Sequence, residues 1–287
     1  MNQLTTDKRA QIVACLVEGN SIRATCRMTG AAKNTVVRLL VELGGACECF
    51  HDLTMNGLTC KRVQVDEIWS FVYAKNRNVP DTKLLPMDSG GRHRGAGDVW
   101  TWTAIDADNK LAVSWLIGGR DAGYARTFMH DIASRLANRV QLTSDGLAAY
   151  LLAVPEAFGD DVDFATLQKI YGPDGVERSP ERKYSPGKIN GSKRVAVIGE
   201  PDVGHVSTSF VERNNLTMRM GMRRFTRLTN GFSKKLRNLE CAVALHFTHY
   251  NFCRKHMTLK TTPAVAVGVA DHVWSLEELV GLLKESN

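Results

Sequence analysis

The sequence predicts a mixed α/β fold in which helices flank a central sheet, preceded by a small all-α domain. Residues 1–44 carry helical patterning alone. Residues 62–171 then run strand, strand, strand, helix, strand, helix, strand, an order typical of a mixed central sheet. With 287 residues, of which 44% are apolar and 23% charged, the chain can bury a core of that size.

Residues 1–44 predict three short helices. The first follows Thr6, Ser21 caps the second, Thr29-Gly30 makes a tight turn, and the third runs from about residue 32 until Gly44-Gly45 ends it. This is the spacing of a helix-turn-helix. Its third helix begins with side chains suited to base edges and phosphates, namely Lys33, Asn34, Thr35 and Arg38. A plain three-helix bundle with solvated charges fits the same pattern.

We interpret residues 46–61 as a linker. They contain Cys47, Cys49, His51 and Cys60, but the first two cysteines are too close for a structural zinc pair and no second pair follows. The chain has seven cysteines, an odd number, which favours reduced thiols. There is neither a run of 18 apolar residues nor a secretory signal, so we expect a cytoplasmic protein that does not enter a membrane.

The sheet is predicted from alternating apolar runs. A buried strand over residues 63–73 and strands over 99–105 and 111–117 form an antiparallel meander, in which residues 74–98 are a loop and Asp106 and Asp108 belong to a turn. A helix over 122–138, a strand over 140–144, a helix over 147–154 and a strand over 164–171 follow. The Gly/Pro-rich, basic residues 172–204 predict a long inserted loop.

The most basic part of the chain comes last. Eleven lysines and arginines against two acids lie between Glu212 and Lys260, on two predicted helices, and the net charge of the chain is +7. This distribution favours a polyanionic partner whose binding is sensitive to salt. Residues 261–287 predict a helical tail.

Three acids suggest a metal site. Asp66 lies inside the first strand, Asp145 ends the fourth strand before a Gly turn, and Glu212 begins a helix. Carboxylates in such an arrangement suit Mg²⁺, which prefers oxygen ligands, and a pair of ions serves phosphodiester chemistry. Singly, a salt bridge, a turn and a helix N-terminus explain the same residues. Glu67 should face the other side of the strand from Asp66, so we interpret it as structural.

The motifs around these acids are long enough to carry a resemblance. The chain resembles bacterial insertion-sequence transposases of the DDE type, most of all those of the insertion sequence one family, in residues 65–72, 100–106, 143–146, 207–220, 223–230 and 246–254. Family members often carry an N-terminal zinc motif, which is not evident here, and the stretch between Asp145 and Glu212 is longer than a minimal core needs.

The resemblance implies a ribonuclease-H-like catalytic domain over residues 62–260, after a DNA-binding domain over 1–45 and the linker, with the insertion at 172–204. It implies that Asp66, Asp145 and Glu212 hold two Mg²⁺ ions, for which Mn²⁺ substitutes. Arg219, seven residues after Glu212, would contact the terminal phosphate. Further DNA contacts would come from Arg213, Arg223, Arg224, Arg227, Lys234 and Lys235.

By the same resemblance the protein binds double-stranded DNA at the ends of its element, cleaves it, and joins the 3′-hydroxyl ends to target DNA. A homodimer or higher oligomer on DNA, associated with the nucleoid, is then expected. Two other functions fit the same residues. One is a ribonuclease-H-like nuclease without strand transfer, and the other is a catalytically silent DNA-binding repressor.

Overall fold

The sheet organises the molecule. The computed structural model describes residues 4–80, 95–171 and 189–285. Within them, six strands lie in the order β3-β2-β1-β4-β5-β6. The pairs β1–β2, β2–β3 and β5–β6 are antiparallel, whereas β4 is parallel to both β1 and β5. This is the ribonuclease-H-like order with one further edge strand, so the predicted mixed α/β sheet flanked by helices is confirmed. The strands are β1 (Arg62–Val72), β2 (Gly97–Asp106), β3 (Ala112–Gly118), β4 (Val140–Ser144), β5 (Val162–Tyr171) and β6 (Ile189–Ile198).

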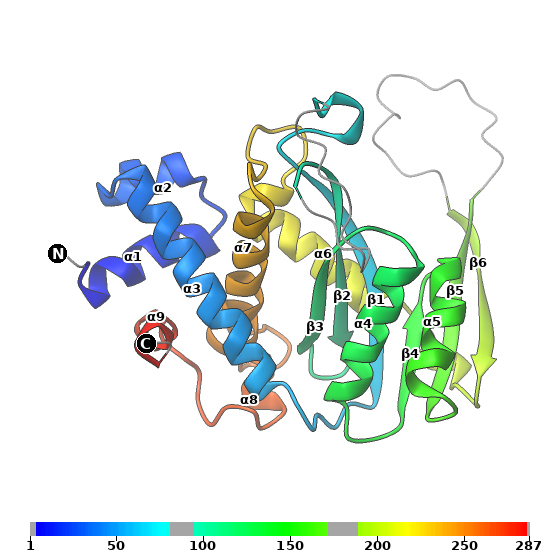
Figure 1. The fold of residues 1–287 in the computed structure, drawn as a ribbon. Helices are drawn as coiled ribbons and strands as arrows, with labels where there is room; N and C mark the ends of the chain where they lie inside the picture. Colours follow the sequence, from blue (N-terminus) through cyan, green and yellow to red (C-terminus); the bar gives the residue numbers. More distant parts are fainter. Residues whose placement is uncertain (1–3, 81–94, 172–188, 286–287) are drawn as a thin grey trace.

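Helices cover both faces of this sheet, with α4 and α5 on one face and α6 and α7 on the other (Figure 1). The α7 helix continues into a π-helical turn over His249–Cys253. None of the described helices combines the length and the apolar character that crossing a bilayer requires. The helices are α1 (Thr6–Val17), α2 (Ile22–Thr29), α3 (Lys33–Thr54), α4 (Ala122–Arg135), α5 (Ala148–Phe158), α6 (Ser209–Gly221), α7 (Leu236–Thr248), α8 (Pro263–Ala266) and α9 (Leu276–Glu285).

Two hydrophobic clusters form the core, one on each face of the sheet. Val63 and Val65 of β1 pack with α4 and α5, whereas Ile68 and Val72 belong to the cluster of α6 and α7. The N-terminal helices share this second cluster, and α3 lies beside α7 with α9 near α1 (Figure 1). The N-terminal helices are therefore packed on the half of the chain that forms the sheet.

The predicted end of the third helix at Gly44-Gly45 is wrong, because α3 continues to Thr54 through much of the predicted linker. The reason is close helix packing: a Cβ atom on Gly44 would lie 2.4 Å from the Cβ atom of Cys241 in α7. Gly44 therefore allows two helices to approach each other rather than ending one.

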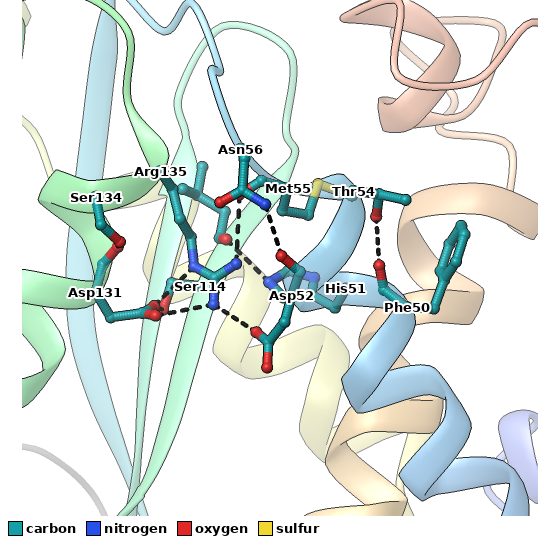
Figure 2. A network of polar contacts seen from close by, with 11 residues as sticks. Phe50, His51, Asp52, Thr54, Met55, Asn56, Ser114, Asp131, Ser134 and Arg135 are labelled. Atoms are coloured by element: carbon teal, nitrogen blue, oxygen red, sulfur yellow. Dashed lines mark hydrogen bonds and ion pairs between the residues drawn. The ribbon is translucent and has the colours of Figure 1, made fainter. Parts of the chain in front are cut away.

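A polar network ties the last turns of α3 to the sheet (Figure 2). The buried guanidinium of Arg135, in α4, donates to Asp131 at 2.8 Å and to Asp52 of α3 at 2.7 Å. Ser114 of β3 donates to the same Asp131. Nearby, His51 bonds through Nε2 to the carbonyl oxygen of Val113 at 3.1 Å, and burial lowers the pKa of its imidazole to about 3. Two residues of the predicted linker thus have structural partners.

A second correction concerns the predicted loop over 172–204. Residues 189–198 form β6, which pairs with β5 at the edge of the sheet, and residues 172–188 lie outside the described part of the chain. Most β6 side chains from Asn190 onward are exposed. An edge strand held mainly by backbone hydrogen bonds lacks the apolar alternation by which strands are recognised in a sequence.

Candidate active site

Three acids meet where β1 and β4 run side by side. These strands are parallel neighbours, and β4 ends at Ser144, so Asp145 emerges next to the middle of β1. Carboxylate oxygens of Asp66, Glu67 and Asp145 all lie within 4.8 Å of one another. We call these three residues the acidic cluster. The structure thus brings together two of the acids singled out in the sequence, Asp66 and Asp145, and adds Glu67.

Asp66 carries the electrostatic signature of this cluster. Burial, together with the charges of Glu67, Asp145 and Glu212, raises the pKa of its carboxyl to about 7. Its Oδ2 accepts a hydrogen bond of 2.8 Å from the amide of Asn215 in α6. The negative charge of the site is thus only partly balanced by its neighbours, as expected of a site that receives a cation.

Glu67 is held from the opposite face of the sheet. Its carboxylate accepts hydrogen bonds from the hydroxyl of Tyr150 in α5 and from Nε of Arg120, the latter at 3.1 Å. Its side chain is 1% exposed, and burial raises the pKa of its carboxyl while Tyr150 opposes the rise. Both carboxylate oxygens of Glu67 thus already accept hydrogen bonds. This fits the structural role expected from strand alternation, even though Glu67 belongs to the acidic cluster.

Glu212 lies outside the acidic cluster of the described residues but close enough to act on Asp66 electrostatically. Its Oε1 accepts from the hydroxyl of Thr208 at 2.6 Å and from the ammonium group of Lys169, in β5, at 2.5 Å. Glu212, the third acid predicted from the sequence, is therefore paired with the ammonium group of Lys169 in this structure.

The α6 helix that carries Glu212 is fixed to β1 by Gln64. The buried amide oxygen of Gln64 accepts from the backbone N–H groups of Phe210 and Val211, at 2.8 and 3.1 Å. These are orphan donors of the first turn, which helices satisfy with a polar side chain. The same strand thus carries Asp66 and, two residues earlier, Gln64, which anchors the helix of Glu212.

Arg219 shares a helix face with Glu212 and Asn215, because positions three and seven residues on fall on one side of a helix. Its guanidinium is half-buried. Burial, and then the charge of Arg227, lowers its pKa, and the charge of Asp66 opposes this. Sequence reasoning identified Arg219 but missed Gln64 and Asn215. The available signals were a polar residue inside an apolar strand and the helical spacing from Glu212.

The sequence-predicted DNA-contacting residues come from two segments that the fold brings together. A cavity of about 860 Å³ lies between the N-terminal helices and the loop over residues 222–235, which joins α6 to α7. Its walls include Lys33 and Asn34 from the start of α3 and Arg223, Arg224, Lys234 and Lys235 from that loop. Arg38 and Arg213 are exposed on α3 and α6, Thr35 is half-buried, and Arg227 is exposed on the loop.

The donor set of the site fits a hard divalent cation. The described acids offer carboxylate oxygens, which are the preferred ligands of Mg²⁺ and are also accepted by Mn²⁺. The raised pKa of Asp66 reflects burial first and then the negative charge of its neighbours, which such an ion would neutralise. The site thus combines a ribonuclease-H-like sheet, an acid within β1 and another directly after β4, and a basic surface beside them.

No protein-family model and no curated protein matches the chain. Among solved structures it is similar to the Mos1 transposase paired-end complex with left transposon end, at 11% identity and a TM-score of 0.25, over 57% of this chain and 60% of that one. The Mos1 strand transfer complex matches at 11% identity and a TM-score of 0.24, over 57% of this chain and 59% of that one. The chain therefore covers less than two thirds of these Mos1 chains.

A piggyBac transposase synaptic complex with hairpin DNA matches at 10% identity and a TM-score of 0.36, over 99% of this chain and 71% of that one. Likeness at this distance leaves the chemistry of the site to be argued from the residues of this chain.

Proposed function

We propose that this protein is a DNA transposase that cleaves the ends of its element and joins the 3′-hydroxyl groups to target DNA. The observation that carries the proposal is the position of Asp66 and Asp145, which meet where the end of β4 lies beside the middle of β1, next to a basic surface. The motifs shared with insertion-sequence transposases support the same activity.

In this proposal Asp66 and Asp145 would hold the metal, and Glu212 would complete the site from α6. Two Mg²⁺ ions would supply Lewis-acid chemistry, since such ions activate an attacking oxygen and stabilise the leaving one. Gln64 and Asn215 orient α6 and the Asp66 carboxylate. Arg219, on the same helix face as Glu212, pairs with a DNA phosphate, and Glu212, which is paired with Lys169 in this structure, would serve as the third metal ligand.

The proposed DNA contacts extend over both basic segments. The first turn of α3 reads base edges and phosphates through Lys33, Asn34, Thr35 and Arg38. The loop over 222–235 binds the phosphate backbone close to the acids. Because transposition joins two element ends to one target, the protein acts as a dimer or higher oligomer on DNA.

The test is a strand-transfer assay on DNA that carries the protein's own element ends, with Mg²⁺ and then Mn²⁺. We expect Asp66→Asn, Asp145→Asn and Glu212→Gln to reduce cleavage and joining to background. Glu156→Gln, an exposed acid of α5, serves as the control and should match the wild type. Wild-type activity in any of the three site variants would contradict the metal assignment.

Two further readouts separate the alternatives. Glu67→Gln should keep substantial cleavage if Glu67 is structural and should lose it if Glu67, rather than Glu212, is the third ligand. Hydrolysed ends without joined product would favour a nuclease. Sequence-specific binding with no cleavage under any metal would favour a repressor.

A further inference from the structure

One edge of β1 is open beside the acidic cluster. Among the described residues, β1 pairs with β4 only over Arg62–Gln64, and the next contact on that edge is an isolated bridge between Val72 and Ser233. Between these points lies a groove of about 1170 Å³, bounded by β1 and by the loop over 222–235. The groove therefore runs along the strand that carries Asp66.

The charges in this groove have one sign. Its described lining contains no acid but five cations, namely Lys75, Arg219, Arg223, Arg224 and Arg227. Within the described ranges 4–80, 95–171 and 189–285, no ion pair is found for Arg219, Arg223 or Arg227. Cations that converge without acidic partners provide a site for a polyanion.

The same groove carries a row of half-buried aromatic rings. The ring centroids of Trp69 and Phe71 are 5.7 Å apart, and those of Phe71 and Phe232 are 4.7 Å apart. The ammonium group of Lys75 lies 5.3 Å from the Trp69 ring centre, and that of Lys234 lies 3.9 Å from the Phe232 ring centre. Aromatic rings beside cations are the arrangement that binds unpaired nucleic acid, since bases stack on the rings while cations hold the backbone.

Leu228 projects from the rim of this groove. Its side chain is 82% exposed, and its backbone has φ +57°, in the left-handed region that a leucine rarely adopts. The loop around it is anchored. Thr226 donates to the carbonyl oxygen of Arg219 at 3.3 Å, Thr229 donates to that of Thr226 at 3.1 Å, and Phe225 is buried. An apolar side chain is thus held in solvent by a well-supported and strained turn.

We propose that the groove along β1 binds an unpaired strand of DNA, and that Leu228 separates the base pairs at the groove's rim by inserting between them. Apolar side chains that enter a base step unstack it in this way. The proposal rests on the proposed function, because the strand so bound leads to Asp66. It adds that the DNA end is opened before it reaches the acids.

Binding is tested in EDTA by fluorescence anisotropy, with a blunt duplex and a forked duplex that has an unpaired arm. We expect the wild type to bind the forked DNA about tenfold more tightly, the equivalent of one or two stacked bases. Phe232→Ala should remove most of this preference and leave blunt-duplex binding within about twofold. Equal affinity of the wild type for the two duplexes would overturn the groove assignment.

Opening is tested with 2-aminopurine in the last base pairs of the blunt duplex, whose fluorescence rises when the base unstacks. The wild type should raise the signal, and Leu228→Ala and Leu228→Asn should not. Leu53→Ala is the matched control, since Leu53 is 81% exposed on α3, and it should behave as the wild type. Leu228→Asn also relieves the backbone, so we expect its Tm to rise by about 2 °C while opening is lost.

The insertion of Leu228 between base pairs, which we call the wedge, can be refuted independently of the proposed function. Opening is measured without metal, so it stands or falls whether or not the protein cleaves DNA. If the wild type cleaves, Leu228→Ala should cleave paired ends poorly and ends with mismatched terminal pairs as well as the wild type does. Opening by Leu228→Ala equal to that by the wild type would overturn the wedge and leave the cleavage result intact.

Discussion

Arg135, at the end of α4, and Asp66, in the middle of β1, are both largely buried, but the charges around them differ. Arg135 has two carboxylates and a backbone carbonyl as partners, so its charge is neutralised within the fold (Figure 2). The carboxylate of Asp66 accepts from the Asn215 amide and from the backbone of Glu67, and it lies near three further carboxylates. The first arrangement stabilises the fold. The second lowers the stability of the fold, as expected of a charge cluster that serves a function other than stability.

The largest expected effect is on the structural side. Arg135→Leu should lower the free energy of unfolding by about 3 kcal/mol, because it leaves Asp131 with only the Ser114 hydroxyl as donor and takes the guanidinium from the Met55 carbonyl. The measurement is urea unfolding. Arg126→Leu is the control, since Arg126 lies on the same helix and pairs with Glu156 in solvent, and it should change stability by less than about 1 kcal/mol. Equal losses in the two variants would contradict the contrast.

Mg²⁺ should stabilise the protein by binding to the acidic cluster. Mg²⁺ at a hundred times its dissociation constant should raise the free energy of unfolding by about 2.7 kcal/mol, because it binds the folded state alone. Thermal unfolding with Mg²⁺ and after EDTA measures this. The double variant Asp66→Asn with Asp145→Asn should lose the response. A Tm that does not move with Mg²⁺ in the wild type would mean that the cluster does not bind it.

Without metal, Asp66→Asn should be more stable than the wild type by about 2 kcal/mol at pH 8, because it removes an unfavourable buried charge. The pKa of Asp66 is raised from 3.8 to about 7 in the folded protein. Its contribution to stability is therefore full below about pH 4 and lost as the pH rises to 7. The gap between variant and wild type should widen over that window, in unfolding curves taken in EDTA, and a gap independent of pH would refute the assignment.

The smallest effect concerns Glu67. Tyr150→Phe removes a hydroxyl donor from its carboxylate and should cost about 1 kcal/mol, since Arg120 remains as a partner. DNA cleavage in Mg²⁺ should change little if Glu67 has a structural role. A large loss of cleavage with unchanged stability would instead place Glu67 among the groups that act in the reaction.

The sequence predicted the sheet well where burial imposed a pattern. The bounds of β4 agree at both ends, and the first three strands agree within two residues. It failed for β6, because the exposed residues of this strand show no apolar periodicity. It also failed at Gly44, because a Gly-Gly pair in the sequence predicts the end of a helix. Only the position of Cys241 across the helix pair reveals the true role of this glycine.

The site shows the same division. Asp145 could be placed from the sequence, because an acid that ends a parallel strand lies at the edge where ligands bind, and there it meets Asp66 within the neighbouring strand β1. The roles of Gln64 and Asn215 depend on contacts between residues about 150 positions apart, which no local pattern contains. The separation of Glu212 from the acidic cluster depends in turn on Lys169 of a different strand.

The N-terminal helices share one hydrophobic core with α7, α9 and the sheet, and this core fixes their position relative to the acids. Val36 and Leu40 of α3 pack in the same cluster as Ile68 of β1, two residues from Asp66. The spacing between the start of α3 and the acids is therefore set by side-chain packing and does not vary as a tethered domain would. Under the proposed function, DNA bound at α3 would be cut at one fixed distance along the duplex.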